Sequence, residues 1–137
     1  MAKINLTWQG NNTFESVHDD GIIMIDNPDE GMENKGMRPK ALMLSSLAGC
    51  SALDIVSLLK KMRAEVDDFK IDVSAELTDE HPRIYKDVVV TYKFYGGDFK
   101  KDKIQKAIDL SVEKYCGVME MFRKFTDITI QVEYFEK

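Results

Sequence analysis

Two cysteines and one arginine are the residues of this chain best suited to carry chemistry. Cys50 lies in an almost uninterrupted apolar run, Arg38 precedes it by twelve residues, and Cys116 lies in the stretch Glu113–Val118. A cysteine reacts as its thiolate, which a nearby cation stabilises against the ordinary thiol pKa of about 8.5. Two thiols with an arginine therefore indicate thiol redox chemistry, and two ordinary buried cysteines are the alternative.

The local surroundings of Cys50 do not favour a thiolate by themselves. It lies about a dozen residues inside a predicted helix, beyond the positive helix end, whose effect fades within a turn. Asp54, one turn further on, would oppose ionisation unless it is itself paired. Twelve helical residues span ~18 Å, so Arg38 reaches Cys50 only by folding back with its loop or by crossing from a partner subunit. An inert Cys50 and a surface Arg38 therefore stay open.

Cys116 lies beside Gly117 at a predicted helix break, where a thiol can approach another element. A disulfide with Cys50 needs Cα atoms ~4.4–6.8 Å apart, and Cys116 as a small core residue is the alternative. A cysteine hydrolase would need His18 or His81 beside Cys50. We expect no metal, because the cysteines and histidines show neither CxxC nor HxxxH spacing.

Length and charge narrow the class of protein. The 137 residues predict one domain over residues 1–137, and the net charge of −5 disfavours nucleic acid as a partner. The first residues lack the apolar core of a signal peptide, so we expect a cytoplasmic protein. The apolar run Ala41–Leu59 has the length of a membrane span, but its Asp54 and its serines indicate a buried core helix, with no membrane partner.

Hydrophobic periodicity predicts an α+β fold with the order βββ-α-ββ-αα-β. The predicted strands are Lys3–Trp8, Thr13–His18, Ile22–Ile25, Phe69–Leu77, Ile84–Tyr95 and Asp127–Phe135. The predicted helices are Pro39–Arg63, Phe99–Tyr115 with Asp98 as its cap, and Val118–Lys124. The first helix is apolar nearly all round, which predicts burial on most sides. One small domain cannot easily surround it, so we expect a second subunit to supply part of the cover.

Three segments, spread over nearly the whole chain, resemble motifs of the OsmC/Ohr family. The central helix with the first cysteine is similar over Arg38–Arg63, the turn between the two middle strands over Glu80–Arg83, and the second cysteine motif over Leu110–Cys116. The resemblance implies the OsmC/Ohr fold, in which a long buried central helix is wrapped by antiparallel sheets in an intertwined homodimer.

The same resemblance implies thiol-dependent reduction of small organic hydroperoxides in oxidative or osmotic stress defence. Cys50 matches the peroxidatic cysteine, which becomes a sulfenic acid, and Cys116 matches the resolving cysteine, which forms a disulfide with it. Arg38 is the candidate for stabilising the Cys50 thiolate. An external dithiol such as a lipoyl group would reduce the pair by thiol-disulfide exchange, without a bound cofactor or metal.

Two features depart from the family pattern. The family's arginine comes from an earlier loop, whereas Arg38 abuts the predicted helix. The studied members place a glutamate ten residues before the first cysteine, where it holds the activating arginine, and this chain has Lys40 there. We therefore expect Glu33 or Asp54 to orient Arg38. The rival function is a non-enzymatic protein that binds a small apolar or thiol ligand in a groove at the dimer interface.

Overall fold

The computed structural model describes residues 1–137, which divide into two compact units, Met1–Met43 and Leu44–Lys137. Helix α1 (Pro39–Lys61) begins in the first unit and continues into the second. The observed order of strands and helices confirms the predicted βββ-α-ββ-αα-β arrangement and the α+β class.

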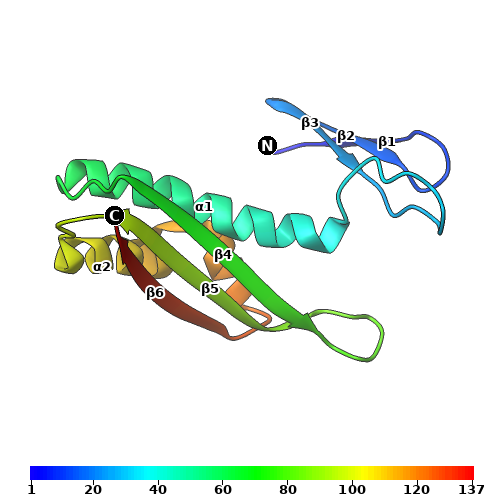
Figure 1. Ribbon diagram of the computed structural model, residues 1–137. Coiled ribbons are helices and arrows are strands. Elements are labelled where there is room, and N and C mark those ends of the chain that lie inside the picture. Colours follow the sequence, from blue (N-terminus) through cyan, green and yellow to red (C-terminus); the bar gives the residue numbers. More distant parts are fainter. The chain divides into compact units, whose positions relative to one another are not determined.

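The N-terminal unit is an antiparallel three-stranded sheet of β1 (Asn5–Trp8), β2 (Phe14–His18) and β3 (Gly21–Ile25), drawn in blue in Figure 1. The register pairs Leu6 with Ser16 and Trp8 with Phe14, so alternate residues form one apolar face. Leu6 and Trp8 are 52% and 67% exposed on this face. Every buried hydrophobic side chain of the chain lies from Leu47 onward, so this sheet has no apolar core of its own.

The loop after β3 returns to the strand and positions Arg38. Met37 forms a parallel bridge with Ile25, and its N–H donates to the carbonyl of Met24 over 2.9 Å. Gly36 is required at this return, because a Cβ atom there would lie 2.5 Å from the carbonyl oxygen of Met24. The loop therefore delivers Arg38 to the start of α1 in a defined conformation.

The second unit is built on a sheet of β4 (Asp68–Leu77), β5 (Tyr85–Gly96) and β6 (Ile128–Glu136), which lie side by side in Figure 1. The prediction of antiparallel sheets is correct for β4 and β5 but wrong for β6, which is parallel to β5. A parallel neighbour needs a crossover, and the helices between β5 and β6 provide it. One face packs into the core through Val90, Tyr92 and Phe94, and the other carries polar pairs such as Lys93 with Asp72.

The second predicted helix is shorter than expected and ends in a wider turn. It comprises α2 (Lys101–Leu110) and a π-helical turn η1 (Ser111–Tyr115). The third predicted helix, Val118–Lys124, is confirmed as α3 (Gly117–Arg123), which follows Cys116. The prediction of Asp98 as the cap is wrong, since Asp98 has a left-handed φ of 55° and Lys100 precedes the first turn. Periodicity at 3.6 residues per turn does not reveal a single π turn.

Helix α1 is buried along one stripe only within a single chain. Leu47, Ser51, Ile55 and Leu59, spaced four residues apart, are buried in the core. The opposite side stays open, with Leu53 75% and Val56 55% exposed. Burial on most sides is therefore not achieved by one chain. By length and composition alone α1 would also suit a membrane span, a property shared by core helices of soluble proteins.

Candidate functional site

The two cysteines lie together in the second unit, and both are thiols. Cys50 is half-buried on α1, directly before the buried Ser51. Cys116 is 3% exposed and joins η1 to α3. The two side chains interact, since Cys50 raises the pKa of the Cys116 thiol. The tertiary structure therefore brings together two residues 66 positions apart in the sequence (50 and 116).

The π turn explains how Cys116 reaches this place. Its N–H donates to the carbonyl of Ser111 over 2.8 Å, five residues back, which widens the last turn before α3. Cys116 then adopts an extended conformation, and its Sγ accepts the N–H of Met119 over 3.3 Å as the cap of α3. Arg123 Nη1 donates to the carbonyl of Val112 over 2.6 Å and braces the same turn.

The electrostatics of the pair keep Cys116 protonated. Burial, then the hydrogen bond to Cys50, raise the pKa of Cys116 to about 11. The Met119 N–H favours the thiolate, whereas the charges of Cys50 and Asp54 raise the pKa further. At neutral pH Cys116 is thus a neutral thiol that can donate its hydrogen to Cys50. The more exposed Cys50 is the thiol that a reagent from solvent meets first.

A chain of polar side chains runs beside the thiols through the core. Ser111 Oγ donates to Asp54 Oδ2 over 2.8 Å and lies 2.8 Å from Ser51 Oγ. Ser51 Oγ in turn lies 2.6 Å from the hydroxyl of Tyr92, whose side chain is fully buried. Burial raises the pKa of Tyr92, so this hydroxyl is neutral. Sequence reasoning missed Ser51, Ser111 and Tyr92, although a serine such as Ser51 inside an apolar run is a signal of a satisfied buried polar group.

Arg38 belongs to the N-terminal unit, where two neutral oxygens hold its guanidinium. Nη1 donates to the carbonyl oxygen of Asp26 over 2.9 Å and to Oδ1 of Asn34 over 3.0 Å. Both bonds use one terminal nitrogen, and Arg38 is exposed, so Nη2 and Nε remain available to an anion. Sequence reasoning did not single out Asp26 or Asn34. The orienting role of Glu33 or Asp54 stays a prediction.

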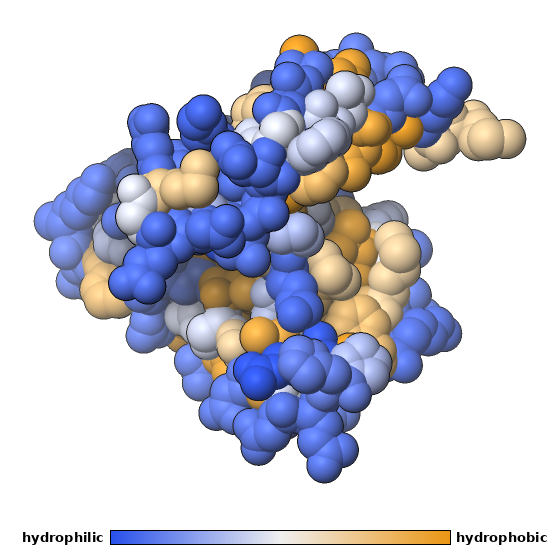
Figure 2. All heavy atoms as spheres, turned by 90° about the vertical axis from the view of Figure 1, so that its right-hand side faces the viewer, coloured by the Kyte–Doolittle hydropathy of each residue, from blue (hydrophilic) through white to orange (hydrophobic).

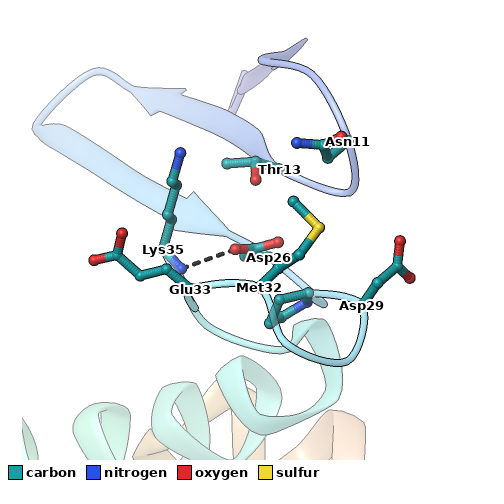
Figure 3. Close-up of a pocket in the computed structure, with 8 residues that line it drawn as sticks. Asn11, Thr13, Asp26, Asp29, Met32, Glu33 and Lys35 are labelled. Carbon is teal, nitrogen blue, oxygen red and sulfur yellow. Dashed lines mark hydrogen bonds between the residues drawn. The ribbon is translucent and has the colours of Figure 1, made fainter.

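The N-terminal unit also contains a cavity of about 230 Å³ between the start of β2 and the loop after β3 (Figure 3). Asp26 lies buried in its wall and accepts the N–H of Lys35 over 2.8 Å. Glu33 and Asp29 also line the cavity. The chain nevertheless contains no group of three acidic, histidine or cysteine side chains that could hold a metal ion.

The two histidines take part in other contacts. His18 lies in β2, with Nε2 3.0 Å from Ser16 Oγ. His81 is exposed in the turn between β4 and β5. The hydrogen bonds of the two thiols described above involve no histidine, so the geometry favours a thiol pair over a cysteine hydrolase.

Comparisons with known proteins identify the family of the chain. Residues 32–131 match the family described as "OsmC-like protein". Protein YhfA of Escherichia coli K12 is 34% identical over 128 residues, which cover 92% of each chain. A hypothetical protein from Aquifex aeolicus VF5 has a crystal structure with a TM-score of 0.88 and 31% identity, covering 100% of this chain and 98% of the other.

A more distant structure has the same fold. The organic hydroperoxide resistance protein OhrB of Bacillus subtilis superposes with a TM-score of 0.67 at 18% identity, covering 96% of this chain and 97% of that one. At this identity the similarity concerns the fold alone. The family match spans most of the chain and runs through both cysteines and Arg38. The chain belongs to the OsmC-like family.

Proposed function

We propose that this protein is a thiol-dependent peroxidase that reduces small organic hydroperoxides, with Cys50 as the nucleophile and Cys116 as the resolving thiol. The observation that carries the proposal is the interaction between a half-buried free thiol, Cys50, and a buried one, Cys116. Membership in a family with structural relatives named organic hydroperoxide resistance proteins supports a stress-related, peroxidase-like role.

The proposed reaction has two steps at the thiol pair. The Cys50 thiolate attacks a peroxide oxygen, the O–O bond breaks, and the alkoxide leaves and takes up a proton to become the alcohol. Cys50 is thereby oxidised to a sulfenic acid. The Cys116 sulfur then attacks the Cys50 sulfur, water leaves, and a disulfide forms. An external dithiol such as a lipoyl group supplies two electrons and restores both thiols by exchange.

Arg38 is the proposed stabiliser of the Cys50 thiolate, following the family resemblance. Two of its hydrogen bonds fix Nη1, and the exposed guanidinium retains two further nitrogens for an anion. A cation near a thiolate lowers the cost of ionisation. The variant Arg38→Ala should therefore slow the reaction of Cys50 at neutral pH more than Arg38→Lys does.

The proposed assembly is a homodimer, and the proposed location is the cytoplasm. The apolar face of the N-terminal sheet and the outer stripe of α1 are uncovered in one chain, with Trp8 67% and Leu53 75% exposed. Hydrophobic side chains are visible at the surface in Figure 2. Exposed apolar surface of this kind on each unit marks an interaction site, and a second copy would supply the cover. We propose that both units then act as one domain, residues 1–137.

Intact-mass analysis of the reduced protein after one equivalent of cumene hydroperoxide tests the proposal. We expect the loss of two hydrogens, mapped to a link between Cys50 and Cys116, with one equivalent of alcohol formed. The variant Cys50→Ser should form no alcohol. The variant Cys116→Ser should accumulate a sulfenic acid, or more highly oxidised forms, at Cys50.

A contrary outcome would be equally clear. If both thiols stay reduced in folded protein and no alcohol appears, the family reaction is absent. The fold would then serve another role, such as binding a small apolar or thiol ligand. Full turnover in Cys50→Ser would likewise refute the assigned nucleophile.

A further inference from the structure

Ser111 connects the two cysteine segments through both its backbone and its side chain. Its carbonyl accepts the N–H of Cys116 over 2.8 Å and closes the π turn. Its hydroxyl donates to Asp54 Oδ2 over 2.8 Å, and Asp54 lies one helical turn beyond Cys50 on α1. One buried residue therefore holds the Cys116 turn against the helix segment that carries Cys50.

The hydrogen-bond chain through Ser111 has a single direction. Each hydroxyl has one hydrogen to donate, and that of Ser111 goes to the Asp54 carboxylate. Ser51 must then donate to Ser111, and Tyr92 must donate to Ser51. All three hydroxyl dipoles point toward Asp54.

The negative charge of Asp54 adds to burial and to Cys50 in raising the pKa of Cys116. The groups that face the Cys116 thiol are Cys50 and Asp54 from α1, Tyr92 from β5 and the Met119 N–H from α3. Tyr92 is neutral, and the Met119 N–H is the one group of the four that favours a Cys116 thiolate. A negative Asp54 opposes it. A neutral Cys116 can donate a hydrogen bond to a Cys50 thiolate, whereas a second thiolate would repel it.

We propose that Asp54 and Ser111 are positioning residues of the thiol pair: Ser111 fixes the Cys116 turn beside Cys50, and the Asp54 carboxylate, held by the Ser111 hydroxyl, adds to burial in opposing a negative charge on Cys116. The assignment deepens the proposed function, on which it rests for its catalytic meaning. It gives Asp54 a partner and a role different from orienting Arg38.

The charge role is tested on Cys116 alone, without peroxide. In the Cys50→Ser protein Cys116 is the single thiol, so mass spectrometry follows its alkylation by iodoacetamide as a function of pH. Adding Asp54→Asn removes the charge but keeps an oxygen that accepts the Ser111 hydrogen. We expect the midpoint of the pH profile to fall by roughly half a unit to one unit, with the high-pH rate unchanged.

The matched control for this charge change is Asp109→Asn. Asp109 is exposed on α2 and accepts a hydrogen bond from Gln105 over 2.9 Å. Removing the Asp109 charge should leave the midpoint of the Cys116 pH profile unchanged. The charge role is overturned if Asp54→Asn leaves the midpoint unmoved, or if only the high-pH rate rises, because the latter reports loosened burial instead of a changed charge.

The geometric role is tested by the equilibrium between dithiol and disulfide in glutathione redox buffers, with both cysteines present. We expect Ser111→Ala to weaken the disulfide by roughly three- to tenfold, the effect of one lost buried hydrogen bond. Ser111→Thr, which keeps the hydroxyl, should recover most of the loss. Ser74→Ala, on the exposed side of β4, is the control and should match the wild type. A Ser111→Ala protein with the wild-type equilibrium overturns this role.

These measurements separate the inference from the proposed function. If the wild-type protein does not reduce peroxide, but the pH profile of Cys116 alkylation depends on Asp54, the proposed peroxidase is refuted and the charge role of Asp54 is supported. If the protein reduces peroxide, but the pH profile of Cys116 alkylation does not depend on Asp54, the peroxidase is supported and the charge role of Asp54 is refuted.

Discussion

Removing the hydroxyl of Tyr92 should destabilise the protein by a predictable amount. The side chain is fully buried, and its hydroxyl lies 2.6 Å from Ser51 Oγ. Tyr92→Phe keeps the ring and leaves the Ser51 oxygen without its donor, which costs about 1–2 kcal/mol of unfolding free energy. An unfolding entropy of about 2.1 cal/mol/K per residue converts this into a Tm lower by roughly 3–7 °C for a chain of this length.

The assay is thermal and urea unfolding followed by circular dichroism at pH 7, with protein concentration held constant because a dimer couples stability to concentration. Tyr115→Phe is the matched control, since Tyr115 is 51% exposed, and it should change stability by less than about 0.5 kcal/mol. A double-mutant cycle with Ser51→Ala measures the coupling of the two hydroxyls directly.

One result would refute the reasoning behind this prediction. If Tyr92→Phe is as stable as the wild type and the cycle gives no coupling to Ser51, the polar chain contributes nothing to the fold. The hydrogen-bond chain from Tyr92 to Asp54 would then have no defined direction, because a hydrogen bond without energetic effect cannot orient the neighbouring hydroxyl.

Three further outcomes are expected. The pKa of Cys116 is raised from 9.0 to about 11 in the folded protein. Its contribution to the free energy of unfolding is therefore fully present below pH 9 and is lost as the pH rises toward 11. Urea titrations should show that the free energy of unfolding declines less over this range in Cys116→Ala than in the wild type. Gly36→Ala should lower the Tm, since the added Cβ would lie 2.5 Å from the Met24 carbonyl oxygen. Gly21→Ala is the control and should not lower the Tm, because no atom lies within 4 Å of a Cβ there. Equal Tm values for the two variants would contradict the close approach of Gly36 to Met24. Leu53→Asp should weaken the proposed dimer by roughly 100-fold or more in sedimentation equilibrium, because each copy would lose a leucine that the interface covers. A dimer of unchanged strength would place the interface elsewhere.

Local patterns in the sequence were sufficient for the strands and helices. The alternation through Val88, Val90, Tyr92 and Phe94 predicts β5 within one residue at each end, because burial on one face of a sheet repeats every second residue. The Arg38-Pro39 start and the apolar run likewise predict α1. The cysteines were identified by their chemistry, and the family by the motifs around them.

Contacts between distant segments decided the features of the fold that local patterns do not predict. The parallel direction of β6 depends on the crossover from β5. The π turn before Cys116 contains Ser111, whose hydroxyl donates to Asp54, 57 residues away. Neither the direction of β6 nor the π turn appears in the hydrophobic periodicity of the sequence, because contacts with distant segments select each of them.

The site shows the same division between local and long-range information. The sequence alone determined which residues could react: two thiols, an arginine and the carboxylates near them. Only the tertiary structure placed Cys50 against Cys116, gave Arg38 the oxygens of Asp26 and Asn34 as acceptors, and joined Tyr92 to Ser51. The physical reason is that reactivity begins with residue type, whereas protonation and orientation are set by neighbours that the fold brings from elsewhere in the chain.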